Sequence, residues 1–397
     1  MRCSQRMKPR PLLPVTRDWY AHVFGFPEGG LDDTRKFVNH EAVCPAPTVD
    51  EITGLEHFHY VRHGEPKREV VAGAFQVLSV RDLRAKVHGA LAQAKALGPV
   101  STALDGKVTV TNQVGESRAL HTLPELTGAV FQAASQFNCL EFASPTMTPE
   151  NGIACYCDDR TQGPACALAG AAGTQFRQHG VQVPGSSHRG QSSQHQLNTL
   201  TAVEAVVLSR TGTRAPWTVG NGYIDADPAQ LRELSASIDA DPELKREMHD
   251  ALQIGVQFDT EVTADFDPVA PPYFVTQTFN SAISVGYSRC TAEDWSVVGR
   301  LVLEASYEAT FLVAVLNNCW RLLKQRPPRP LLLTKLGGGV FQNDPAWIRG
   351  AIEHGARAVA ALGVALDCRI VHLSEVEEGY DEFVNQLLRR SKRAEAF

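Results

Sequence analysis

The pattern of hydrophobic and polar residues changes near residue 127. From there on, short apolar runs alternate with amphipathic stretches, which is typical of strands that alternate with helices. Such a chain tends to form a parallel or mixed sheet with helices on both faces, so the pattern predicts a three-layer α/β/α fold. Strands are predicted within 129–142, 254–262, 274–285, 331–336 and 369–373, and helices within 164–178, 197–208, 228–252, 295–323 and 345–362.

The first 100 residues give weaker signals. Apolar residues have helical spacing within 82–97, and 107–112 indicates a short strand. We therefore expect residues 1–105 to be an N-terminal extension packed on the core of a main domain at 106–385 and fused to its sheet. A basic tail follows at 386–397, and its end is expected to fray.

Composition narrows the class of protein. The chain has 397 residues, of which 43% are hydrophobic and 21% charged, values that suit one large globular domain or two average ones. The net charge of −6 argues against a general nucleic-acid binder, which would carry a basic face. No apolar run approaches the roughly 20 residues that cross a bilayer, so we expect no membrane partner.

Cysteine and histidine patterns predict no metal site. The nine cysteines are scattered, and the one-residue spacing of Cys155 and Cys157 fits neither a zinc knuckle nor a redox pair. His57, His59 and His63 lie close together, but their spacing matches no standard metal site. We expect reduced thiols in a cytoplasmic protein that holds no metal.

The strongest local signal is a glycine loop within 331–347. An apolar strand runs into Gly337, Gly338 and Gly339, and Asp344 then precedes Pro345 as N-cap and first helical residue. Glycines let the backbone turn and approach a ligand closely, and a helix N-terminus favours anions. The segment therefore predicts a phosphate site at the carboxyl end of a strand.

Two familiar phosphate loops do not match this segment. A Walker loop ends in Gly-Lys-Ser/Thr, whereas this loop continues through Val340 and Phe341. A dinucleotide fingerprint requires a glycine where Gln342 stands. A tight turn without any ligand remains the structural alternative.

A second polar loop follows the first predicted strand of the main domain. Asp158 and Asp159 precede the alanine-rich helix, where carboxylates complement the helix dipole without any further function. The functional alternative is a loop that wraps a ribose and supplies acceptors for its hydroxyl groups. Its candidate ligand-contacting residues are Asn138, Glu141, Gly152, Gln162 and Gly163.

Together the two loops resemble those of macrodomains, the α/β modules that bind ADP-ribose. In that family, a strand ends in an Asn-containing turn and leads through a glycine-bearing loop to an Ala-rich helix. Asn138, Gly152 and 171–173 occur here in that order. The family's second loop is Gly-x-Gly-Val-Phe, and Gly337, Gly339, Val340 and Phe341 match it.

This resemblance covers about residues 127–375 and extends to the poly(ADP-ribose) glycohydrolase branch and to the MavL-type arginine-specific hydrolases. It implies a macrodomain-like fold, ADP-ribose or an ADP-ribosylated protein as partner, and no cofactor. The diphosphate would lie on 337–341 and near Gly163. The Gln-Glu-Glu pattern of the glycohydrolases is absent, however, so their familiar mechanism is not expected here.

Carboxylates are the candidates for catalysis. Hydrolysis at the ribose anomeric carbon passes through an oxocarbenium-like state, which a carboxylate stabilises while it activates water. Asp259 and Glu261 alternate with Thr260 at a strand end, so they are expected to share one face. A solvated loop remains the alternative for these acids. Asp158 and Asp159 are the competing pair, for which the helix dipole remains the alternative.

Two further features of the chain invite a role. Glu304 and Glu308 lie four apart on an otherwise apolar helix, so they require partners; anchoring an arginine is favoured over contact with substrate. Tyr307 or Phe341 could stack on adenine.

We therefore expect a hydrolase that removes ADP-ribose from protein side chains, with arginine as the first choice of linkage. Three alternatives stay open. The protein could read ADP-ribosyl marks without cleaving them, act on another ADP-ribose derivative, or be an unrelated enzyme of nucleotides or sugar phosphates.

Overall fold

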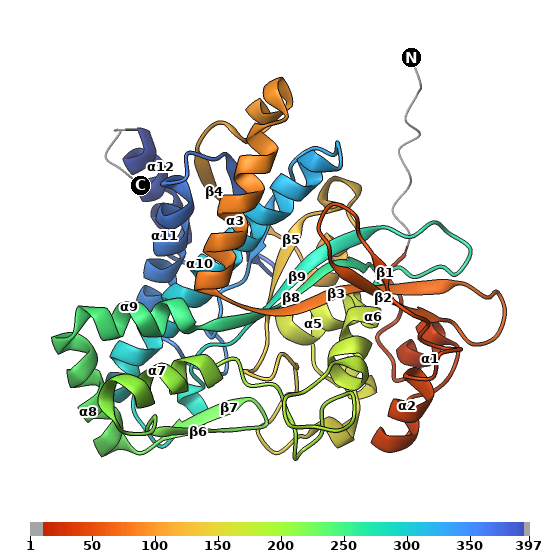
Figure 1. The fold of residues 1–397 in the computed structure, drawn as a ribbon, viewed down its shortest axis with the longest axis horizontal. Coiled ribbons are helices and arrows are strands. Elements are labelled where there is room, and N and C mark those ends of the chain that lie inside the picture. Colours follow the sequence, from red (N-terminus) through yellow and green to blue (C-terminus); the bar gives the residue numbers. More distant parts are fainter. Residues whose placement is uncertain (1–10, 393–397) are drawn as a thin grey trace.

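Strands from both halves of the chain meet in one mixed sheet (Figure 1). The computed structural model describes residues 11–392, apart from the side chains of 99–101 and 391–392. Within that range the strand order of the nine-stranded sheet is β1-β2-β3-β8-β9-β5-β10-β11-β4. The strands are β1 (Thr48–Val49), β2 (Glu56–Val61), β3 (Glu69–Ser79), β4 (Val108–Val114), β5 (Val130–Ala134), β8 (Gln253–Glu261), β9 (Phe274–Asn280), β10 (Leu331–Leu333) and β11 (Leu366–His372).

Strand direction decides which loops share an edge of the sheet. The strands β9, β5, β10, β11 and β4 run parallel, whereas β8, β3, β2 and β1 are antiparallel to their neighbours. The carboxyl ends of β5, β9 and β10 therefore lie at one edge. The carboxyl end of β8 lies at the opposite edge, because Glu261 pairs with Phe274 at the start of β9.

Alternate residues of the central strands enter cores on opposite faces of the sheet. Leu331 and Leu333 pack in the core with α3 (Val80–Lys95), α10 (Ala292–Leu323), α11 (Pro345–Ala360) and α12 (Tyr380–Lys392). Leu332 points to the other face, where α5 (Gln162–Ala169) and α6 (Ala171–Gln175) lie. This alternation is the period of two expected for strands buried on both faces, and it confirms the three-layer α/β/α fold.

The longest helix, α10, crosses the sheet and packs along α11. Its start is defined by a capping box in which Thr291 and Asp294 each bond the other's backbone N–H. Most of its residues are buried, because it has sheet on one side and α3, α9 (Pro242–Ala251) and α11 on the others. In the described part of the chain, neither this helix nor any other has the length and apolar character needed to cross a membrane.

The expected N-terminal extension contributes directly to the sheet. The strand β3 pairs antiparallel with β8 from Ala74 opposite Phe258 to Ser79 opposite Gln253. Near it, α1 (Trp19–Phe24) and α2 (Leu31–Val38) lie beside the β1–β3 end of the sheet. At the other terminus α12 continues to Lys392, so the part of the expected tail at 386–392 is helical. Residues 393–397 lie outside the described residues.

A smaller lobe stands beside the sheet (Figure 1). It comprises α7 (Thr201–Thr211), the hairpin of β6 (Trp217–Gly220) and β7 (Tyr223–Ala226), α8 (Pro228–Ala240) and α9 (Pro242–Ala251). Asp227 caps α8 and Asp241 caps α9, so the acidic stretch 228–252 is two helices.

Several expected elements are shorter or divided. The helix expected at 164–178 breaks at Gly170, and an added Cβ at this residue would lie 2.7 Å from the Gln277 Oε1 of β9, so there is no room for a side chain. A π-helical turn at Phe176–Gly180 then follows α6. The strand expected to reach residue 336 ends at Leu333, and the last three residues belong to the glycine loop. The eight cysteines within 11–392 are free thiols.

Candidate active site

A cavity of about 310 Å³ opens at the sheet edge where β5, β9 and β10 end. Residues 134–136 after β5, Ala282 after β9 and 334–337 after β10 line it. The N-terminus of α5 closes another side with residues 161–164. The two loops singled out in the sequence therefore meet in one cavity, although about 200 residues separate them.

Hydrogen bonds from the buried Asn343 and Tyr307 side chains hold the glycine loop in place. Gly337 has φ +75°, and an added Cβ would lie 2.6 Å from the Ala282 Cβ, so only glycine fits there. The Asn343 side chain donates to the Ile283 carbonyl at 2.7 Å. The Tyr307 hydroxyl donates to the Thr334 carbonyl (2.7 Å) and accepts from the Leu336 N–H (3.0 Å). These bonds fix the loop before any ligand arrives.

Backbone N–H groups of this loop are left for a ligand. Within residues 11–392, the amides of Gly337, Gly339, Val340 and Phe341 donate no hydrogen bond. Gly339 and Val340 are exposed, and Gly337, Gly339, Val340 and Phe341 line the cavity; Gly338 does not. A run of unpaired amides on a turn is a typical anion-binding arrangement.

The two helix N-termini near the cavity differ. Thr161, the N-cap of α5, makes no side-chain capping bond, so the first amides of that helix stay available. Gly163 is needed there because an added Cβ would lie 2.0 Å from the Ala134 carbonyl oxygen. The N-terminus of α11 is instead capped by Asp344, which accepts from the Ala346 N–H at 2.7 Å. Of these two helix ends, only that of α5 has no side-chain cap.

Three aromatic rings form one wall of the cavity. Tyr223 of β7 lies 5.2 Å from the ring of Tyr287 and 5.5 Å from that of Phe341, and the last two are 6.0 Å apart. A planar base can pack against such rings. Of the two rings proposed for adenine, Phe341 lines the cavity, whereas Tyr307 is buried beneath the loop. The sequence analysis missed Tyr223 and Tyr287, because they come from a hairpin and a loop far from either motif.

Lys335 lines the cavity, but the partners of its ammonium group do not. Its ammonium group pairs with the Glu377 carboxylate and lies 3.3 Å from the His372 Nδ1. Burial, with a smaller effect of Lys335, lowers the pKa of His372, so this imidazole stays neutral beside the ammonium group. Sequence analysis missed Lys335 as well, although it directly precedes the glycine loop.

Of the neighbouring acids Asp158 and Asp159, one faces the cavity. Asp159 lines it, and one carboxylate oxygen accepts from the Thr161 N–H at 2.8 Å. Asp158 does not line it; its side chain is 54% exposed and lies 2.6 Å from the Arg17 guanidinium. The hydrogen bond from Arg17 holds the pKa of Asp158 below its usual value.

The acids Asp259 and Glu261 lie at the opposite edge of the sheet. The ladder is irregular between residues 257 and 260, and Asp259 has φ +51°, so the simple alternation expected there is broken. Asp259 lies 3.5 Å from the Lys324 ammonium group, whereas Glu261 is buried and pairs with Arg68. The structure therefore does not bring them to the glycine loop, because β8 is antiparallel to β9.

Glu141 is at the cavity wall, but its carboxylate is covered. The side chain is fully buried and lies 3.3 Å from the Arg177 guanidinium. Burial raises the pKa of Glu141 to about 7, against the lowering effect of Arg177. A carboxylate without access to the cavity supports the loop rather than contacting a ligand.

The remaining candidates shape the first loop. The Asn138 side chain accepts from the Leu140 N–H at 3.0 Å and lies outside the cavity. Gln162 lines the cavity and continues the pairing of β5, since its side chain accepts from the Ala134 N–H at 2.8 Å. Gly152 also lies outside, where an added Cβ would be 2.7 Å from a Glu28 carboxylate oxygen.

No protein-family model and no curated protein matches the sequence. Among solved structures, poly(ADP-ribose) glycohydrolase from Deinococcus radiodurans in complex with ADP-ribose is 12% identical, with a TM-score of 0.34 over 81% of this chain and 95% of that one. The glycohydrolase from Thermomonospora curvata bound to the inhibitor ADP-HPD is 14% identical, with a TM-score of 0.32 over 84% and 93%. At such TM-scores neither fold nor function follows from the likeness, so both rest on this chain's own residues.

Proposed function

We propose that this protein hydrolyses the bond between ADP-ribose and a protein side chain, with arginine as the favoured linkage. One observation carries the proposal: unpaired backbone amides from two loops, an aromatic wall and an accessible carboxylate surround the same cavity. A nucleoside diphosphate sugar presents the matching groups, which are a planar base, two phosphates and a reactive anomeric carbon.

The diphosphate is assigned to the amides. Those of Gly337, Gly339 and Val340 would bind one part of it, and the uncapped start of α5 at Gly163 the other. Lys335 also lines the cavity and would add a positive charge nearby, although its ammonium group is paired with Glu377, which does not line it. The backbone of a rigid loop binds an anion without ordering any long side chain, which limits the entropic cost.

The adenine base is assigned to the aromatic wall. Tyr223, Tyr287 and Phe341 offer ring faces and edges, and Tyr223 is fixed because its hydroxyl donates to the Phe142 carbonyl at 2.9 Å. An aromatic contact adds about 0.5–1.5 kcal/mol beyond the burial of apolar area.

Asp159 is proposed to activate the attacking water. It would accept a proton as the water oxygen bonds to the anomeric carbon, while the carbon–nitrogen bond breaks and its electron pair stays on the guanidine. An ADP-ribosylated guanidinium already carries a positive charge, so it leaves as a neutral guanidine without a second acid. This is why arginine suits a cavity with one accessible carboxylate.

Binding is tested by calorimetric titration of ADP-ribose into wild type and Gly339→Glu. An added Cβ at Gly339 meets no heavy atom within 4 Å, so the variant should fold, yet it introduces a negative charge beside the proposed phosphate site. We expect affinity to fall at least tenfold, or about 1.4 kcal/mol. Gly350→Glu is the matched control, because Gly350 is equally open but lies on α11 outside the cavity. Absence of binding by the wild type would exclude the proposal.

Catalysis is tested by release of ADP-ribose from ADP-ribosylarginine protein. Asp159→Asn should reduce release by about 10²-fold or more while ADP-ribose still binds. Asp158→Asn is its neighbour control: the Asp158 carboxylate lies outside the cavity and interacts with Arg17 and the Cys157 thiol, so release should stay unchanged. Equal rates for Asp159→Asn and wild type would remove Asp159 from the mechanism.

A second function is favoured by one observation. Among the described residues that line the cavity, Asp159 is the one whose carboxylate is accessible, whereas glycoside hydrolysis commonly uses two. A module that reads ADP-ribosyl marks would bind ADP-ribose, lose binding in Gly339→Glu, and release nothing from any linkage.

A further inference from the structure

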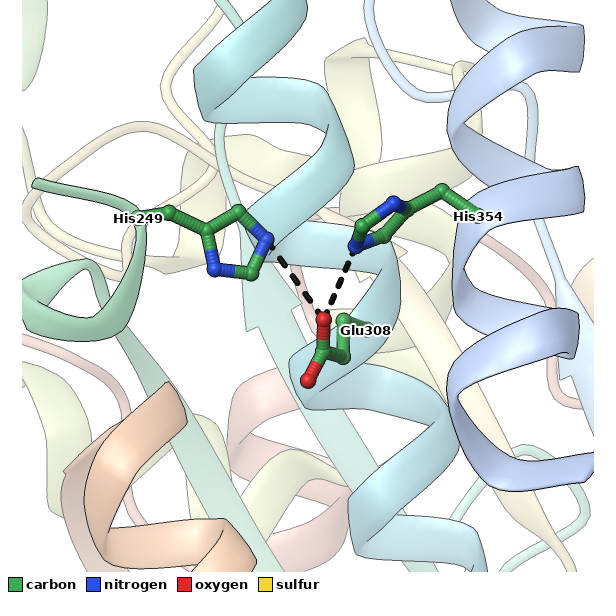
Figure 2. A group of neighbouring side chains, drawn as sticks. All are labelled: His249, Glu308 and His354. Carbon is green, nitrogen blue, oxygen red and sulfur yellow. Dashed lines mark hydrogen bonds and ion pairs between the residues drawn. The ribbon is translucent and has the colours of Figure 1, made fainter. Parts of the chain in front are cut away.

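Three helices, α9, α10 and α11, bring two histidines and a glutamate together (Figure 2). His249 comes from the last turn of α9, Glu308 from the middle of α10 and His354 from α11. None of the three lines the proposed ADP-ribose cavity. The cluster therefore calls for a separate explanation.

Its donor atoms converge on one point. His354 Nε2 lies 2.8 Å and His249 Nε2 3.5 Å from the same oxygen, Oε2 of Glu308. The three ligand atoms all lie within 4.8 Å of one another. Zinc bonds of about 2.0–2.1 Å in a tetrahedral site place neighbouring donors about 3.3 Å apart, so these positions require only small shifts.

His249 lacks a hydrogen bond at this point. The residue is 8% exposed, and its Nε2 atom is buried without a hydrogen-bond partner among the described residues. A buried polar atom without a partner costs free energy unless something else satisfies it. The nitrogen faces a carboxylate oxygen, and a cation between them would satisfy both.

The surroundings orient the carboxylate for this purpose. Arg84 of α3 binds the other oxygen of Glu308, with Nε 2.7 Å and a terminal nitrogen 2.6 Å from Oε1. Arg84 also lies 2.6 Å from Asp250, which is 3.7 Å from Nδ1 of His249. Such partners of the ligands are common around metal sites, because they fix which atom faces the metal. The negative charge of Asp250 offsets the positive charge of Arg84.

We propose that His249, Glu308 and His354 bind a divalent transition-metal ion, with zinc as the first candidate. Two imidazoles and a carboxylate suit zinc and disfavour magnesium and calcium, which prefer oxygen ligands alone. The His354 side chain is 38% exposed, which provides an entry path and leaves a fourth position for water. The ion would link α9, α10 and α11, and this differs from the expectation of no metal.

The proposal is tested on the full chain after treatment with EDTA. Calorimetric titration with Zn²⁺ should show one tight site per chain, and Zn²⁺ should raise the Tm. His354→Gln should weaken binding at least tenfold and abolish the shift in Tm. His188→Gln is the control, because His188 is an exposed histidine outside the cluster, and it should bind as the wild type does.

Two outcomes would overturn the site. One is the lack of saturable Zn²⁺ binding by the wild type, in which case Glu308 and His354 share only a hydrogen bond. The other is wild-type affinity in His354→Gln. A titration of the wild type with Mg²⁺ keeps the test independent of any variant: we expect at least 100-fold weaker binding than for Zn²⁺, and equal affinity would contradict the proposed ligand set.

Discussion

At the scale of single residues, position relative to the sheet decides what an acid can do. Asp158 and Asp159 are neighbours in sequence, yet one pairs with Arg17 at the surface and the other lines the cavity. Glu141 also belongs to that wall, but burial against Arg177 removes its carboxylate from any ligand. The chemistry of the site therefore depends on which face each loop residue presents.

Burial of one histidine, His121, also makes the stability of the fold depend on pH. His121 is fully buried; its ring stacks on Phe131 at 3.7 Å, and Nδ1 lies 2.7 Å from the Ser117 carbonyl oxygen. Burial lowers the pKa of His121 from 6.5 to about 4. The unfolded chain binds a proton below pH 6.5 and the folded chain does not, so this stability is complete above 6.5 and is lost as pH falls toward 4.

For this lowering of the His121 pKa, the free energy of unfolding falls by about 3 kcal/mol on full acidification. Urea unfolding of wild type and His121→Gln between pH 7 and pH 4.5 measures it. The variant should be less stable at pH 7 but lose less free energy of unfolding on acidification. Parallel pH dependences for the two proteins would contradict the assignment to His121.

The loops around the cavity have stronger local sequence signals than the acids proposed for its chemistry. Glycines, an N-cap and a proline act locally, so the strand-to-helix turn at 337–345 could be predicted from the sequence, and anion binding there stays a prediction. The position of Asp259 and Glu261 depends on β8 being antiparallel to β9, and strand direction has no local signal. Tyr223 and Tyr287 reach the cavity through tertiary packing, which residue spacing along the chain does not predict.

At the scale of helices and strands, the junction of α10 and α11 supports the glycine loop. Tyr307 of α10 bonds both Thr334 and Leu336 at the exit of β10. Gly355 of α11 packs against α10 near Tyr307. An added Cβ would lie 2.6 Å from the Phe311 ring and 3.1 Å from the Tyr307 carbonyl carbon. The spacing of the two helices therefore depends on the absence of a side chain at Gly355.

Gly355→Ala should lower the free energy of unfolding by about 1–3 kcal/mol, since the methyl group forces the helices apart. Gly350→Ala is the matched control on the same helix, where an added Cβ meets nothing within 4 Å. There alanine should stabilise the helix, by up to about 1 kcal/mol. Urea unfolding of both variants provides the comparison, and equal effects would show that packing at Gly355 is not limiting.

Prediction of the helices and strands succeeded where the pattern was long. The expected helix at 295–323 corresponds to α10, whose apolar run and capping box are both local signals. The break between α5 and α6 was missed, because it arises where Gly170 meets Gln277 of β9, more than 100 residues away. At the break, the Ala169 carbonyl accepts from the Thr263 N–H at 2.7 Å and the Ala171 N–H donates to the Thr263 Oγ1 at 2.9 Å, and such distant partners are not visible in the local sequence.

At the scale of the whole molecule, the first third of the chain is part of the central sheet. The extension at 1–105, expected to be fused to the sheet of the main domain, supplies β3, which lies between β2 and β8. Arg68, at the start of that segment, pairs with the buried Glu261, and the Val71 N–H donates to the same carboxylate at 3.0 Å. The sequence showed little of this, since a strand that pairs with residues 180 positions away carries no local mark of its partner.

A chain of residues 106–397 should therefore fail to unfold cooperatively, although it contains every proposed site residue. Removing β3 exposes the edge of β8. It also leaves the Glu261 carboxylate without Arg68, although Glu261 is only 2% exposed in the full chain. Far-UV circular dichroism during urea unfolding measures this, and co-expression with residues 1–105 should restore a single transition. A steep transition of the shortened chain alone, at the urea midpoint of the full chain, would show instead that 106–397 is an independent domain. Its stability would then have to come from the parallel half of the sheet.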